Sequence, residues 1–229
     1  MRLKLFAILL AIAHLTTPAA ANHPGADLDN VMTKKEQYFQ KVDKPAPPFE
    51  LLDAKGQPAT LQMFSDKVVV LHFIYANCPN VCPLHAEKLA ELQGMINGSP
   101  MKDLVQFISI TTDPQNDTAE VLASYGPEHG LDQSNWRFLT VPPDQDEATT
   151  RALAGSFSHK FMKGDDGLQV HNVVTHVIDK NGRWAANFHG LKFEPLNLVL
   201  YINGLINNGH SSDHLHKKIS WWEKLKNMF

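Results

Sequence analysis

Cysteine is scarce in this sequence, and so is any long apolar run. Its 229 residues hold only two cysteines, Cys78 and Cys82, which lie too close together to staple distant parts of a fold. A small scaffold held together by disulfides is therefore excluded. No stretch reaches the roughly 20 apolar residues that a membrane-spanning helix needs, and a formal charge of -3 makes nucleic acid an unsuitable partner. The remaining composition, 43% apolar and 20% charged, is typical of one globular domain.

The first 21 residues have the three regions of a secretory signal peptide. Arg2 and Lys4 precede an apolar stretch from Leu5 to about Leu15, and small residues end at Ala21. We therefore predict cleavage after Ala21 and export to the periplasm, with an uncleaved membrane anchor as the alternative. Residues 22–44 lack a sustained apolar period and are predicted to be a tether. Residues 45–208 are predicted to fold as the domain, and residues 209–229 to form a histidine-rich, basic and aromatic tail.

Strand and helix periods alternate along the domain. The run from Val68 to Ile74 is almost continuously apolar, which suits a strand buried on both faces of a parallel sheet. Pro83 is suited to the first turn of a helix, with Cys82 as its approximate N-cap. The pattern predicts an α/β sandwich with a central mixed β-sheet flanked by helices. Further strands are expected at 49–52, 104–110, 136–140, 173–178 and 183–188, and further helices at 117–125, 147–157 and 195–206.

The two cysteines are placed where thiols become reactive. Cys78 follows a buried strand and Cys82 begins a helix, so both lie near positive backbone dipoles that favour the thiolate. Thiolates bind soft metals and exchange disulfides, and the Cys78-Pro-Asn-Val-Cys82 spacing alone does not choose between these two uses. Copper(I) is satisfied by two thiolates and an imidazole. An inert local disulfide is the third interpretation.

The strand and loop together resemble a known family. The run from Val68 to Pro83, which contains Cys78-Pro-Asn-Val-Cys82, resembles the copper-site motif of the Sco/SenC family. The segment 109–118 is similar to that family's Ser-Ile-Asp-Pro-x-x-Asp-Thr segment with one residue inserted, and 121–125 matches the helix that follows. The resemblance covers roughly 45–206. It implies a thioredoxin-like fold, copper as the bound metal, and a copper chaperone for cytochrome oxidase assembly.

The resemblance also implies a third ligand. Family members carry a histidine eight residues before the aspartate of an Asp-x-x-Gly turn, and here Asp179 places that histidine at His171. Thioredoxin-like oxidoreductases typically have a cis-proline in this place, so His171 favours copper over general dithiol exchange. His176 lies inside the predicted strand and is expected to be a packed histidine. Asp113 could orient His171 through an outer hydrogen bond, whereas Asp117 is more simply a helix cap.

The other histidines have weaker claims to a role. His72 and His85 share positions with apolar residues of a strand and a helix, so both are predicted to be packing residues. His210, His214 and His216 lie in the tail, where they could gather metal weakly. The basic and aromatic residues 217–229 have roughly helical spacing and could contact a membrane surface.

Three functions compete for the cysteine loop. The first is an exported metallochaperone that delivers copper, through Cys78, Cys82 and His171, to a respiratory enzyme subunit or to another copper carrier. The second is a thiol-disulfide reductase in which Cys78 attacks and Cys82 resolves, keeping a client's copper-ligating cysteines reduced. A peroxidase of the peroxiredoxin type is disfavoured, because Tyr75 and Leu71 stand where such enzymes place threonine or serine and proline.

Overall fold

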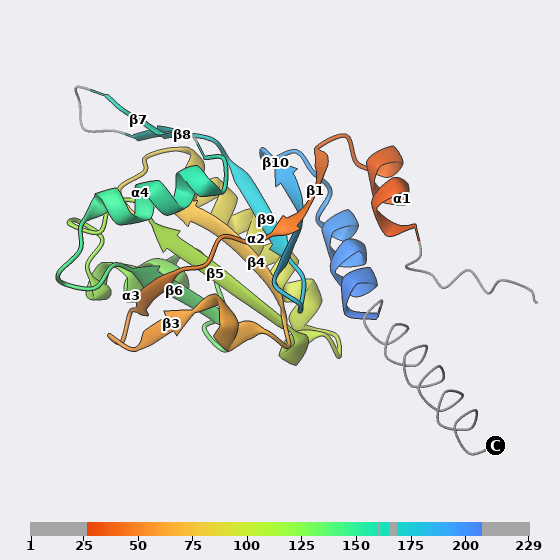
Figure 1. Cartoon of the computed structure of the whole chain (residues 1–229), viewed down its shortest axis with the longest axis horizontal. Helices are drawn as coiled ribbons and strands as arrows, with labels where there is room; N and C mark the ends of the chain where they lie inside the picture. The colour runs from red at the N-terminus through yellow and green to blue at the C-terminus, as the bar shows by residue number, and fades with distance from the viewer. Residues whose placement is uncertain (1–26, 160, 165–168, 208–229) are drawn as a thin grey trace, which may run out of the picture.

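A mixed β-sheet forms the centre of the molecule (Figure 1). The structure, a computed structural model, describes residues 27–159, 161–164 and 169–207. In this part of the chain the sheet has eight strands in the order β1-β10-β9-β4-β5-β6-β2-β3, and β7 and β8 form a separate hairpin. The strands are β1 (Phe39–Pro45), β2 (Glu50–Asp53), β3 (Pro58–Thr60), β4 (Val68–Ile74), β5 (Val105–Thr111), β6 (Trp136–Thr140), β7 (Phe161–Lys163), β8 (Gln169–His171), β9 (Val174–Ile178) and β10 (Arg183–His189).

Helices cover both faces of this sheet. They are α1 (Leu28–Lys35), α2 (Val81–Asn97), α3 (Ala119–Glu128) and α4 (Glu147–Ser156), with short 3-10 helices η1 (Leu61–Phe64) and η2 (Lys102–Leu104) and a last helix over 195–207. None of the helices in the described ranges is long and apolar enough to cross a membrane. The predicted α/β sandwich with a mixed sheet is confirmed.

The parallel centre of the sheet explains the apolar strands in the sequence. β4 pairs in parallel with β5, and β5 in parallel with β6, while β9 runs antiparallel to β4. Every residue of β4 and β5 is buried, because helices pack on both faces of these two strands. Alternate side chains of β4 therefore enter two different cores: Val68, Val70 and Ile74 enter one, and Val69, Leu71 and Phe73 the other.

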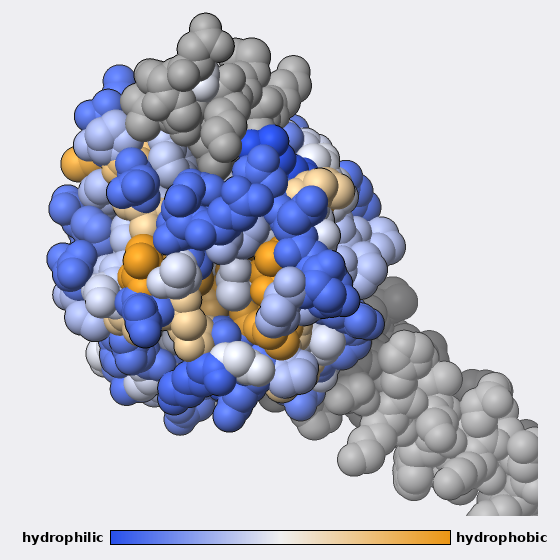
Figure 2. Space-filling model, turned by 90° about the vertical axis from the view of Figure 1, so that its left-hand side faces the viewer, coloured by the Kyte–Doolittle hydropathy of each residue, from blue (hydrophilic) through white to orange (hydrophobic). Residues whose placement is uncertain are grey.

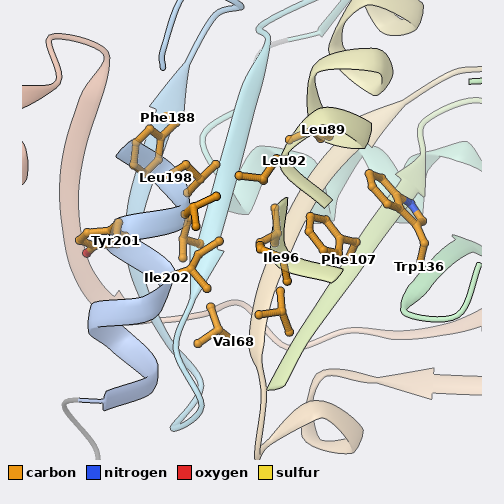
Figure 3. Close-up of a cluster of buried hydrophobic side chains, with 14 of the residues drawn as sticks. Val68, Leu89, Leu92, Ile96, Phe107, Trp136, Phe188, Leu198, Tyr201 and Ile202 are labelled. Carbon is orange, nitrogen blue, oxygen red and sulfur yellow. The ribbon is translucent and has the colours of Figure 1, made fainter. Parts of the chain in front are cut away.

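The larger core lies between the sheet and three helices. α2 contributes Leu89, Leu92 and Ile96 at helical spacing, and the last helix contributes Leu198, Tyr201 and Ile202 (Figure 3). α3 joins the same core through Leu122 and Tyr125. The opposite face is covered by α4 and η1, whose buried residues include Ala154 and Phe64. Both helices that follow the central parallel strands, α2 and α3, thus lie on one side of the sheet.

The predicted tether is wrong from residue 28 onward. Residues of this segment form α1 and then β1, which pairs with β10 from Phe39↔Phe188 to Pro45↔Arg183. The carboxylate of Glu36 accepts hydrogen bonds from Glu194 N and Asn197 Nδ2, which fastens this arm to the start of the last helix. The sequence pattern hid the arm because β1 is an edge strand with only one fully buried residue, so it has no apolar alternation.

Smaller differences concern boundaries. α2 begins at Val81 with Asn80 as its N-cap, so Cys82 lies inside the first turn rather than at the cap. Thr118, whose hydroxyl accepts from Val121 N, caps α3 in place of the expected Asp117. The β7–β8 hairpin was not predicted. The signal peptide (1–21) and the tail (209–229) lie outside the described residues.

Candidate metal centre

The cysteine loop lies at one edge of the central sheet. β4 and β5 are parallel, so their carboxyl ends meet at this edge, and residues 75–80 connect β4 to α2 there. β9 is antiparallel to β4 and therefore begins at the same edge. Figure 2 views this end of the molecule and shows hydrophobic residues in the middle of the face, surrounded by hydrophilic ones. A cavity of about 290 Å³, lined by the loops after β5 and β6, adjoins the cysteine loop through Asp117.

Cys78 and Cys82 are brought together by the first turn of α2. The backbone N–H of Cys82 donates to Cys78 Sγ at 3.3 Å, and Cys78 N donates to Tyr75 O at 3.1 Å. Both residues are free thiols, and they are 5% and 2% exposed. The two sulfurs thus share one small, nearly closed space with Tyr75 and Val81. The backbone of the loop and of the first turn of α2 thus brings the side chains of Cys78 and Cys82 together, as their spacing predicts.

The two thiols of the pair differ in acidity. The hydrogen bond from the Cys82 side chain lowers the pKa of Cys78 to about 4, and backbone N–H groups of Asn80 and Cys82 act in the same direction against the cost of burial. The pKa of Cys82 is raised, first by that same hydrogen bond and then by burial. The two shifts run in opposite directions, so Cys78 is the thiol of the pair that ionises more readily.

Asp117 lies beneath the loop, and the sequence did not assign it there. Its carboxylate accepts from the backbone N–H of Ala76 at 3.1 Å and from the hydroxyl of Thr111. Burial raises the pKa of Asp117 to about 6, opposed by these two hydrogen bonds. The residue is only 1% exposed, so it ties the cysteine loop to the end of β5 from inside. The Asp117-Thr118 pair is visible in the sequence, but such a pair is typical of a helix cap.

Asp113 follows β5 at the same edge. Its carboxylate accepts from Asn116 Nδ2 at 2.9 Å, and its backbone carbonyl accepts from Asn116 and Asp117 in a turn. These contacts organise the loop that leads to α3. The expected hydrogen bond in which Asp113 accepts from His171 stays a prediction.

His171 is the last residue of β8, where its backbone pairs with Phe161. Three residues later the chain enters β9 at the edge that carries the cysteine loop, and His85 of α2 bonds Thr175 of β9 at 2.8 Å. The start of β9 therefore lies at the edge that carries the cysteine loop, and the role of His171 as a ligand stays a prediction. The side chain of His171 lies outside what the structure describes.

The histidines predicted to pack are buried and paired. His72 bonds Ser109 at 2.6 Å, and His85 bonds Thr175. His176 is fully buried between His159 and Asn187, at 2.9 and 2.7 Å. Its ring nitrogens are thus both engaged within the core, which confirms that His176 is a packing residue.

The residues at this edge suit a soft metal ion. Among the side chains that the structure describes, no group of three or more histidine, cysteine or acidic residues could hold a metal. The two neighbouring sulfurs, of which that of Cys78 has a lowered pKa, are a partial ligand set that favours thiophilic ions over hard ones such as Mg²⁺ or Ca²⁺. The fold and this dithiol edge define a thioredoxin-like protein with a soft-metal or redox site.

Comparison with known proteins assigns the family. The SCO1/SenC family model matches residues 38–206. The chain belongs to the SCO1/SenC family. It is 26% identical to the SCO1 protein homolog of Bacillus subtilis over 167 residues, which cover 72% of this chain and 84% of the relative.

Solved structures of the same family share the fold. BsSco, described as a member of the Sco family of cytochrome c oxidase assembly proteins in which a disulfide switch was identified, superposes with a TM-score of 0.64 at 20% identity, covering 73% of this chain and 96% of BsSco. Yeast Sco1, crystallised with copper bound, superposes with a TM-score of 0.57 at 22% identity, covering 68% and 84% of the two chains.

Proposed function

We propose that this chain binds copper at the sheet edge through the sulfurs of Cys78 and Cys82, with His171 as the third ligand. The observation that carries the proposal is the pair of buried, adjacent sulfurs, of which that of Cys78 has a lowered pKa. Copper(I) prefers thiolate ligands and accepts an imidazole beside them. Metal binding at this site would require only the Cys82 thiol to lose a proton. Such a site is suited to load and release its ion by ligand exchange.

Copper is the cargo in this proposal, and the recipient is a respiratory copper site such as that of cytochrome oxidase, or another copper carrier. Family membership and the titles of BsSco and yeast Sco1 support this assignment. The leader pattern of residues 1–21 supports export to the periplasm. Exposed apolar side chains at the same end, Leu84 of α2 and Val121 of α3, offer a surface on which a client protein could dock.

Copper titration followed by X-ray absorption tests the ligand set. The wild type should bind one ion with two sulfur neighbours and at least one nitrogen. Cys78→Ser and Cys82→Ser should lose tight binding, and His171→Ala should lose the nitrogen neighbour and bind Cu(II) much more weakly. His189→Ala is the matched control, because this half-buried imidazole is bonded to Gln40 on β1. Unchanged copper affinity in His171→Ala would remove the third ligand from the proposal.

A thiol-disulfide reductase is the second candidate, and the acidity of Cys78 favours it. The Cys78 thiolate would attack a client disulfide, and Cys82 would then resolve the mixed disulfide. The client gains two electrons and is released as two thiols, while Cys78 and Cys82 become a disulfide that an external dithiol must reduce. A reduction potential measured beside a client-reduction assay separates the two: a chain that binds copper tightly but reduces no mixed disulfide is a carrier.

The tail has two further proposed roles. His210, His214 and His216 would gather metal for the main site, and residues 217–229 would hold the protein against a membrane surface. A chain ending at residue 208 should bind the tightly held ion as before, and should lose weak additional copper sites and vesicle binding.

A further inference from the structure

His159 is a buried histidine between the end of α4 and the β7–β8 hairpin (Figure 1). Its side chain is 5% exposed, and its Nε2 lies 2.9 Å from Nε2 of His176 on β9. Its ring also packs against Phe73 of β4, at a centroid distance of 4.8 Å. Two residues later the chain enters β7. His159 therefore joins the start of the hairpin to the central sheet.

The end of α4 turns the chain toward the sheet at this point. Ser158 N donates to Gly155 O at 2.8 Å and His159 N to Ala154 O at 2.9 Å, which is the hydrogen-bond pattern of a Schellman cap. Ser158 has a φ of 63° at the position where glycine is usual. A residue with a side chain adopts this conformation at a cost in free energy, so the surrounding structure must hold the turn. The buried ring of His159 holds it.

The neighbouring side chains fix the direction of the hydrogen bond between the two histidines. The indole N–H of Trp184 can only donate, and it lies 2.8 Å from Oδ1 of Asn187. That amide oxygen can only accept, so Nδ1 of His176, 2.7 Å away from it, carries a proton. Burial lowers the pKa of His176 well below its ordinary value, so the ring is neutral and its Nε2 has a lone pair. The Nε2–H of His159 is therefore the donor.

This hydrogen bond closes the base of the segment that carries His171. Residues 160–175 lie between the two bonded histidines. In this segment the backbone of His171, the last residue of β8, pairs with Phe161 of β7. Beyond β8, Val173 O accepts from Gly190 N at 2.8 Å. The backbone around His171 is thus tied to the main sheet directly on one side, and through β7 and the histidine before it on the other.

We propose that the hydrogen bond from His159 to His176 positions the β7–β8 hairpin, and with it His171, for the metal ion. His159 is then a positioning residue, and the inference rests on the proposed copper site with His171 as its third ligand. Without the donor, Nε2 of His176 loses a buried hydrogen bond and the start of β7 loses its contact with β9. More of the cost of ordering His171 then falls on metal binding, which lowers the affinity.

His159→Phe tests the proposal, because phenylalanine keeps a ring beside Phe73 and removes the donor. His159→Gln is the conservative variant, since its amide N–H can reach His176 and restore the bond. Tyr201→Phe is the matched control, because it removes a different buried hydrogen bond, from its hydroxyl to Asp29 at 2.8 Å. Cu(II) and Cu(I) affinities are measured by competition with chelators, and the stability of the metal-free proteins by thermal unfolding.

His159→Phe should weaken Cu(II) binding about tenfold, which corresponds to one hydrogen bond. Its Cu(I) affinity should change less, because thiolate ligands by themselves suit Cu(I). His159→Gln should bind Cu(II) as the wild type does. Tyr201→Phe should lower the melting temperature and leave both affinities unchanged. In electron paramagnetic resonance of the Cu(II)-loaded proteins, the nitrogen coupling of a bound imidazole should weaken in His159→Phe and not in Tyr201→Phe.

A double-mutant cycle separates positioning from general stability. If His159 acts through His171, His159→Phe should have no further effect on Cu(II) affinity in the His171→Ala background. Wild-type Cu(II) affinity in His159→Phe, or an equal loss in both backgrounds, would overturn the role of His159 alone. Wild-type Cu(II) affinity in His171→Ala would instead overturn the proposed third ligand, and the role of His159 with it. Should His159→Phe not fold, His159→Asn replaces it, because its shorter amide stays polar but does not reach His176.

Discussion

Replacing Cys82 with alanine removes the group that contributes most to the acidity of Cys78. The pKa of Cys78 is lowered to about 4, and the hydrogen bond from the Cys82 side chain is the first cause. A hydrogen bond to a charged group contributes about 1.5–3 kcal/mol, and one pKa unit corresponds to about 1.36 kcal/mol. Loss of the donor should therefore raise the pKa of Cys78 by about one to two units. The thiol would still be mostly ionised at neutral pH, because backbone N–H groups of Asn80 and residue 82 remain.

The pKa is measured as the midpoint of the ultraviolet thiolate absorbance against pH, and independently from the pH dependence of alkylation by iodoacetamide. Cys82→Ser serves as the control, since its hydroxyl can still donate and the rise should be smaller. A pKa of Cys78 that is the same in Cys82→Ala and the wild type would refute the assignment of Cys82 as the donor. It would leave the helix N-terminus and the loop N–H groups as the source of the acidity.

Three further changes test other parts of the structure. Burial raises the pKa of Asp117 from 3.8 to about 6, so this group stabilises the fold at low pH, and that contribution is lost as the pH rises through about 6. Asp117→Asn should abolish this pH-dependent part of the unfolding free energy, which amounts to about 3 kcal/mol between acid and neutral pH. Denaturant titrations of both proteins across that pH range measure it. Glu36→Gln should lower the unfolding free energy by about 1–3 kcal/mol, because it weakens the charged contact to Asn197 and the last helix, whereas Glu50→Gln on the exposed side of β2 should change it little. Gly126→Ala should cost about 1–3 kcal/mol by forcing α3 away from β6, and an unaffected melting temperature would show that the ring it meets moves aside.

The sequence predicted those elements whose burial leaves a strong pattern. The run from Val68 to Ile74 could be identified as a central strand because helices cover both its faces and every position is apolar or packed. The stripe of α2 was visible for a similar reason, since Leu89, Leu92 and Ile96 face one core. The arm formed by α1 and β1 was missed, because an edge strand that pairs on one side needs few apolar residues.

The residues of the site also differ in how far the sequence could predict their positions. Cys78 and Cys82 are separated by one turn of chain, so local backbone geometry brings their sulfurs together and the sequence is sufficient to pair them. Asp117 reaches the site from a different strand-helix unit. Its position before a helix could be predicted, but its distance from the cysteine loop depends on how β5 pairs with β4.

By itself, then, the sequence determined the α/β architecture, the family motif and the presence of a reactive dithiol, since each depends on residues close together in the chain. Only the tertiary structure decided how the dithiol is tuned. The hydrogen bond with Cys78 and burial raise the pKa of Cys82, and Asp117 holds the loop from beneath because β5 ends beside β4. Burial and the proximity of distant segments set acidity and hydrogen bonding, and neither can be read from residue order alone.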